Sequence, residues 1–147
     1  MSTAARLDLE PEILAARITD AHASDDDWMD RFQTAIGRRR SGGELQRVLA
    51  VWSLSKADAA RLFGVTRQAI LKWTRDGVPA DRLTAVGDLA AATDLLLRFL
   101  RPDRIPAVVR RPFDDAGGRT LLELVADDPA LALAHVRAMF DVSRAHV

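Results

Sequence analysis

Apolar residues recur along most of the chain in steps of three and four, the spacing that gathers side chains on one face of a helix. The pattern predicts one short helix after Pro11 and another at about 25–36, with Ser24 as its N-cap and Gly37 at its end. The arginine- and glycine-rich run that follows, residues 38–43, has the composition of a basic linker. The first part of the chain is therefore expected to be an N-terminal helical extension that ends in a linker.

The rest of the chain is densely helical by the same criterion. Its first half predicts four helices, at about 44–52, 55–63, 66–75 and 79–100. Its second half predicts a helical turn and two further helices, at about 105–111, 120–126 and 129–142. Many Ala, Leu and Arg residues and few β-branched or aromatic ones favour helix over strand. We therefore expect an all-α fold in three parts, residues 1–43, 44–100 and 101–147.

Residues 55–75 have the pattern of a helix-turn-helix, in which two short helices are joined by a tight turn. Ser55 and Asp58 have the spacing of a capping box at the start of the first helix. Gly64 stands where the turn needs a left-handed residue, and Thr66 is placed to cap the second helix. The residues expected to lock the two helices together are Ala59, Ala60, Phe63, Val65, Ile70 and Trp73.

The exposed face of the second helix follows by elimination. It consists of Thr66, Arg67, Gln68, Leu71, Lys72 and Arg75. Arginine can pair with guanine, and glutamine with adenine, through two hydrogen bonds, while the remaining basic side chains suit bases or phosphates. The set predicts binding to double-stranded DNA. The alternative is a solvated basic face on an ordinary helical hairpin.

Charge is distributed in a way that agrees with this prediction. The chain as a whole has a formal net charge of zero. Residues 37–82, however, hold ten basic and four acidic side chains, whereas residues 1–36 hold three basic and eight acidic ones. A basic segment that coincides with the motif is the electrostatic footprint that phosphate binding requires.

The predicted long helix carries an apolar seam. Its members alternate in three- and four-residue steps: Leu83, Val86, Ala90, Thr93, Leu97 and Leu100. The seam packs either inside the chain or against a second copy. We expect a homodimer, because two helix-turn-helix units related by a twofold axis place their recognition helices about 34 Å apart on one face of the duplex.

Other chemistry has little support in the sequence. There is no cysteine, which excludes disulfides and cysteine–zinc sites. His22, His135 and His146 lack ligand spacing and are expected to be surface residues, so no metal and no cofactor is predicted. Neither a nucleophile with its base nor a phosphate loop is recognisable, which argues against an enzyme. With no signal peptide or apolar stretch of membrane length, we expect a cytoplasmic protein.

The last predicted helix has an unusually broad apolar face, formed by Leu131, Leu133, Val136, Met139 and Phe140. Met139 and Phe140 are residue types enriched in the centres of protein interfaces. Arg137, Arg144 and His146 lie close to the end of the chain. These residues predict a partner-binding surface, and the alternative is that the apolar side chains complete the protein's own core.

Residues 62–80 run Leu-Phe-Gly-Val-Thr-Arg-Gln-Ala-Ile-Leu-Lys-Trp and on to Gly-Val-Pro-Ala, and residues 117–124 read Gly-Gly-Arg-Thr-Leu-Leu-Glu-Leu. With Pro-Asp-Arg-Ile-Pro at 102–106, this order resembles the Xre/MbcA/ParS antitoxins from about Glu44 to Val147. The resemblance implies an N-terminal DNA-binding domain and a C-terminal domain that binds a RES-domain toxin, an NAD-directed protein. It also implies that Arg119 and Leu121 belong to the partner-binding surface.

Two functions remain open at this point. One is an antitoxin that neutralises its toxin by contact and represses its own operator. The other is a free-standing transcriptional regulator whose C-terminal part senses or oligomerises. A third, weaker interpretation is an architectural protein whose helix-turn-helix supports assembly.

Overall fold

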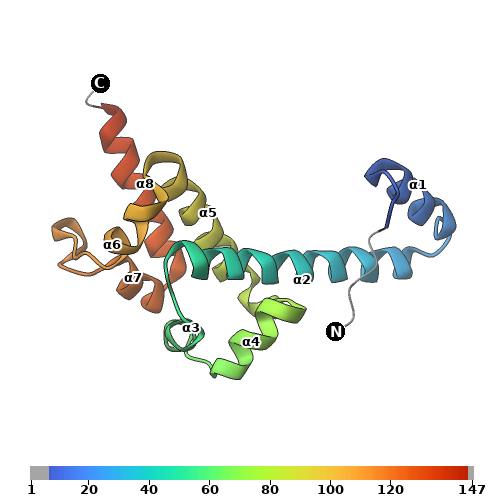
Figure 1. The fold of residues 1–147 in the computed structure, drawn as a ribbon, viewed down its shortest axis with the longest axis horizontal. Helices are drawn as coiled ribbons and strands as arrows, with labels where there is room; N and C mark the ends of the chain where they lie inside the picture. Colours follow the sequence, from blue (N-terminus) through green and yellow to red (C-terminus); the bar gives the residue numbers. More distant parts are fainter. Residues whose placement is uncertain (1–6, 146–147) are drawn as a thin grey trace. The chain divides into compact units, whose positions relative to one another are not determined.

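The computed structural model describes the backbone of residues 7–145 and the side chains of residues 7–141. It confirms the predicted all-α fold, with no strand among the described residues (Figure 1). The α-helices are α1 Pro11–Ala21, α2 Asp26–Val51, α3 Lys56–Phe63, α4 Arg67–Asp76, α5 Leu83–Phe99, α6 Ile105–Val109, α7 Leu121–Asp127 and α8 Pro129–Ala145. Short 3-10 turns are η1 Ala80–Arg82, η2 Pro102–Arg104 and η3 Asp114–Ala116. None of the helices described here combines the length and apolarity needed to cross a membrane.

The chain forms two compact units, Met1–Ile36 and Gly37–Val147. In the described part of the first unit, α1 buries none of its residues. The aromatic rings of this unit stack in series, His22 on Trp28 and Trp28 on Phe32. The backbone N–H of Trp28 donates to Asp25 at 3.0 Å, so Asp25, and not the predicted Ser24, caps the start of α2.

The second helix differs from the prediction, because α2 continues from Asp26 to Val51 without a break at Gly37. Residues 38–43 are therefore helical and do not form a linker. The reason is tertiary: Ser41 and Gly42 are buried, and the Ser41 hydroxyl accepts the N–H of Val78 at 3.0 Å. Contacts with a distant segment thus outweigh the low helix propensity of glycine, which costs only about 1 kcal/mol per residue. The division of the rest of the chain at residue 100 stays a prediction.

The core of the second unit joins both of its halves. It comprises Leu45 and Val48 from α2, Trp52 directly after α2, Ile70 and Trp73 from α4, Val86, Leu89 and Leu96 from α5, and Leu121, Leu124, Leu133 and Val136 from α7 and α8. The most extensive packing is between α5 and α8. The indole N–H of Trp52 donates to the Thr93 hydroxyl at 3.0 Å, and that hydroxyl donates to the Leu89 carbonyl at 2.7 Å. A buried polar pair whose hydrogen bonds are all made fixes the position of Trp52, directly after α2, on α5.

The apolar seam of α5 packs mostly inside the chain. Val86 and Thr93 are completely buried, and Ala90 is nearly so. Only Leu83 of the six seam residues is exposed, at 38%. Internal packing is therefore the role of the seam's central residues, which are not accessible to a second copy. The homodimer itself stays a prediction, but the central residues of this seam cannot form its interface.

Candidate functional site

The α3–α4 hairpin has the local geometry that the sequence predicts. The Ser55 hydroxyl accepts the Asp58 N–H at 3.0 Å, and the Asp58 carboxylate accepts the Ser55 N–H at 3.0 Å, which completes a capping box. Gly64 ends α3 in the left-handed conformation, with φ of 64°. The Thr66 hydroxyl accepts the Ala69 N–H at 3.1 Å at the start of α4. The left-handed Gly64 and the Thr66 cap, both local features, define the turn between the two helices.

The inner face of the hairpin is held by aromatic and aliphatic contacts. Ile70 is fully buried, and the rings of Phe63 and Trp73 meet edge to face, with centroids 5.9 Å apart. Arg82 lies over the Trp73 ring, and its guanidinium donates to the Phe63 carbonyl at 3.0 Å. Because α4 is fixed on this side, its opposite face is presented on a rigid support.

All six side chains predicted to bind DNA are exposed. Arg67, Gln68 and Leu71 line a surface hollow of about 250 Å³, together with Lys56. Lys56 is not among the residues that the sequence pattern predicts. The available signal is its position directly after the Ser55 cap, which places it in the first turn of α3. The outer face of the hairpin therefore combines two cations, an amide and an apolar side chain around one hollow.

The last of the six, Arg75, is engaged within the chain. Its guanidinium donates two hydrogen bonds of 3.0 Å to the carboxylate of Asp76. These bonds raise the pKa of Arg75. They are also the main reason why the pKa of Asp76 is lowered, and the positive charges of Lys72 and Arg39 lower it further. The pair leaves this end of α4 with an acidic group beside its basic ones.

In the C-terminal half, the glycine pair forms a compact loop. Gly117 and Gly118 have φ of 68° and 79°, and the Phe113 N–H donates to the Arg119 carbonyl at 3.0 Å across the loop. The guanidinium of Arg119 pairs with Asp127 at 2.7 Å, at the far end of α7. The predicted partner residue Arg119 is thus exposed, but it braces the loop against α7.

The other predicted partner residues are divided between core and surface. Leu121 is fully buried and offers no side-chain surface to a partner, so its assignment to the binding surface is wrong. The assignment comes from its position beside the glycine pair in the sequence, which does not distinguish a core residue from a partner contact. Met139 and Phe140 are half-buried, and the Phe140 ring stacks on exposed Phe99 with centroids 4.4 Å apart. Arg137 is exposed. The side chain of Arg144, like His146, lies outside the described residues.

His135 is not the surface residue that the sequence predicts. Its side chain is only 11% exposed, and its ring meets Phe113 edge to face at 4.7 Å. Its buried Nε2 has no hydrogen-bond partner. Within the described residues, no three histidine or acidic side chains are grouped as a metal site requires. The ring therefore acts as a packing element between α8 and the glycine loop.

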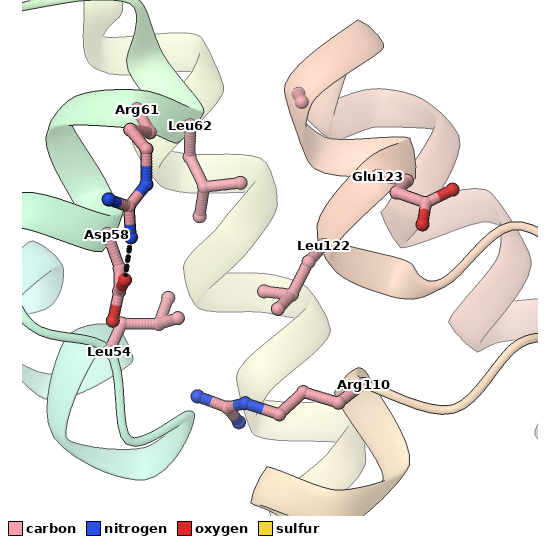
Figure 2. Close-up of a pocket in the computed structure, with 8 residues that line it drawn as sticks. Leu54, Asp58, Arg61, Leu62, Arg110, Leu122 and Glu123 are labelled. Carbon is pink, nitrogen blue, oxygen red and sulfur yellow. Dashed lines mark hydrogen bonds and ion pairs between the residues drawn. The ribbon is translucent and has the colours of Figure 1, made fainter.

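A groove of about 340 Å³ is lined by residues of α3 and α7, which also contact each other (Figure 2). Its lining combines apolar and charged side chains, among them Leu54, Leu62, Leu122, Asp58, Arg61 and Glu123. Arg110 reaches across one end and donates to the carbonyls of Trp52 and Ser53, each at 2.8 Å. This arginine, which no sequence motif indicates, ties the C-terminal half to the end of α2.

No family model matches the chain, and no curated protein matches it. A solved structure shares its fold. It is the crystal structure of the M. tuberculosis MbcT–MbcA toxin–antitoxin complex, one chain of which is 21% identical to this protein with a TM-score of 0.55. The similarity covers 67% of this chain and 91% of that one. The part of the fold that they share thus amounts to nearly all of that chain, while about a third of this chain has no counterpart in it.

Proposed function

We propose that this protein is an antitoxin of the MbcA type, which binds a toxin protein and also binds duplex DNA at its own operator. The observation that carries the first half is the fold, shared over two thirds of the chain with a chain of a toxin–antitoxin complex in which MbcA is the antitoxin. The sequence resemblance to the Xre/MbcA/ParS antitoxins points in the same direction and names a RES-domain toxin as the partner.

The second half of the proposal is supported by α4. Its outer face presents Arg67, Gln68 and Lys72 to solvent, whereas its inner face is locked by Ile70 and Trp73. A helix-turn-helix uses such an arrangement to place the N-terminal part of its second helix against base edges in the major groove. The DNA-binding residues in this proposal are Thr66, Arg67, Gln68, Leu71, Lys72 and Arg75, with Lys56 as an additional phosphate contact.

The toxin-binding surface in this proposal lies on the C-terminal half and on the end of α5. Exposed aromatic and aliphatic side chains remain there after the core is complete, namely Phe99, Leu131 and the accessible parts of Met139 and Phe140. Exposed Arg137 lies on the same helix as the last three of these. Apolar residues with a basic neighbour are typical of the centre and rim of a protein interface.

Two experiments test the two halves separately. In the first, the protein is co-expressed with the tagged product of the adjacent gene; neutralisation predicts that growth is restored and that the two proteins copurify. In the second, the purified protein is titrated against a duplex of its own promoter and against an unrelated duplex. Tight promoter binding without copurification or rescue would indicate a free-standing regulator and would contradict the antitoxin assignment.

A further inference from the structure

The basic stretch of α2 is fixed against the C-terminal end of α4. A Cβ added to Gly42 would stand 2.6 Å from the Trp73 carbonyl oxygen, so only glycine allows the helices to approach this closely. A Cβ added to Gly77 would stand 2.4 Å from the carbonyl oxygen and 2.9 Å from the Cβ of Arg38. With the bond from the Val78 N–H to Ser41, these contacts place residues 38–42 beside the end of α4.

The positive charge at this end of α4 differs in availability from residue to residue. Arg75 is bound to Asp76 through two hydrogen bonds. Arg38 and Arg39 are exposed, and neither forms a hydrogen bond or ion pair with any side chain in the part of the chain that the structure describes, apart from the Ser41 hydroxyl that donates to the Arg38 carbonyl. Arg39 is near enough to Asp76 to help lower the pKa of that carboxyl. Positively charged side chains without an ion-pair partner among the described residues are therefore found beside α4 on α2, at Arg38 and Arg39, as well as on α4 itself.

Helix geometry separates the three consecutive arginines. Successive residues are rotated by about 100° around a helix. Arg38 then shares the face of Ser41 and Leu45, which is the face that bears on α4, and Arg39 lies at its margin. Arg40 lies on the other side of α2.

We propose that Arg38 and Arg39 bind phosphates of the DNA backbone next to the groove that α4 enters. This inference rests on the proposed DNA binding and adds a second element, α2, to that interface. The two side chains contact phosphodiester oxygens and no base, so they strengthen binding to every sequence alike. The backbone that carries them is held in place because Gly42, Ser41 and Gly77 fix α2 to α4, which lowers the entropic cost of aligning the two arginines with the DNA backbone.

The test is the salt dependence of binding by the full-length protein to its promoter duplex and to an unrelated duplex. Removing one phosphate contact reduces the slope of log K against log salt by about 0.9. Arg38→Gln/Arg39→Gln is expected to reduce the slope by about 1.8 and to lower the affinity for both duplexes on the order of tenfold near physiological salt. Arg40→Gln is the matched control, and it is expected to leave the slope unchanged.

Several outcomes overturn the inference, and one overturns the proposed function instead. An unchanged slope for Arg38→Gln/Arg39→Gln, or an equal decrease with Arg40→Gln, would contradict the assigned phosphate contacts while DNA binding stands. If the double variant no longer copurified with the toxin but bound DNA like the native protein, these arginines would belong to the toxin interface and not to the DNA interface. If the native protein binds neither duplex, the proposed DNA binding itself fails. Arg38→Lys/Arg39→Lys keeps both charges and is expected to retain the native slope, which separates loss of charge from loss of folding.

Discussion

The hairpin of α3 and α4 and the pair of α7 and α8 are built alike but expose different kinds of residue. Each begins with a hydroxyl side chain that caps a short helix, Ser55 in one and Thr120 in the other. In the hairpin, the polar binding candidates are exposed, and Leu71 is the one apolar candidate among them, whereas the expected core residues Ile70 and Trp73 are buried. In α7 and α8, apart from Arg137, the partner-binding candidates are apolar like the core residues, and Leu121 and Val136 are completely buried. The amphipathic pattern therefore separates exposed from buried residues more readily where the exposed candidates are polar than where they are apolar.

The largest expected effect follows from the burial of Leu121. Leu121→Ala is expected to lower the free energy of unfolding by about 2–5 kcal/mol, because it removes buried methyl groups and leaves a cavity. Half-buried Leu122, which lines the groove beside α3, gives the matched control, and Leu122→Ala should cost clearly less. Chemical denaturation of both variants measures the difference. If Leu121→Ala were as stable as the native protein but no longer bound the toxin, Leu121 would be a partner contact after all.

A smaller effect is expected where α2 meets α4. Gly42→Ala forces a methyl group against the Trp73 carbonyl and should destabilise the protein by about 1–3 kcal/mol, the usual range for overpacking. A Cβ at neighbouring Gly43 meets no atom within 4 Å, so Gly43→Ala should instead stabilise α2 by up to about 1 kcal/mol. Thermal melting compares the two variants. Equal melting temperatures would show that the close approach of α2 and α4 is unimportant.

The smallest expected effect concerns the capping box of α3. The backbone N–H of Ser55, as the largest cause, lowers the pKa of Asp58 below its ordinary value of 3.8. A carboxyl whose pKa is lower in the folded state contributes stability above its unfolded pKa, and this contribution is lost as the pH falls through the folded pKa. Melting temperatures between pH 7 and pH 2 should therefore fall less steeply for Asp58→Asn than for the native protein. Parallel curves would show that the carboxylate does not stabilise α3.

The parts of the molecule that the sequence predicts well are those governed by neighbouring residues. The caps at Ser55 and Thr66 and the left-handed Gly64 depend on bonds within four residues, and the structure has them where the pattern places them. The continuity of α2 through residues 38–43 depends on contacts with Trp73 and Val78, more than thirty residues away. The composition of residues 38–43 alone therefore cannot predict it.

The candidate sites follow the same division. The exposure of Arg67 and Gln68 follows from helical periodicity once Ile70 and Trp73 are assigned to the core. Leu121 is misassigned from sequence because an apolar residue in a pattern looks the same whether it packs on its own chain or on a partner. The engagement of Arg75 by Asp76 needs side-chain positions, which a sequence does not supply.

The central claim is that DNA and toxin are bound by different surfaces, and Arg67→Ala/Gln68→Ala tests it most directly. Both side chains are exposed and neither contributes to the core, so the variant should fold like the native protein. Its affinity for the promoter duplex should fall by roughly 1–3 kcal/mol for each of the two base-reading side chains removed, measured by titration at fixed salt. In co-expression with the toxin, the same variant should restore growth as fully as the native chain. Native promoter affinity, or failure of the folded variant to neutralise the toxin, would contradict the account.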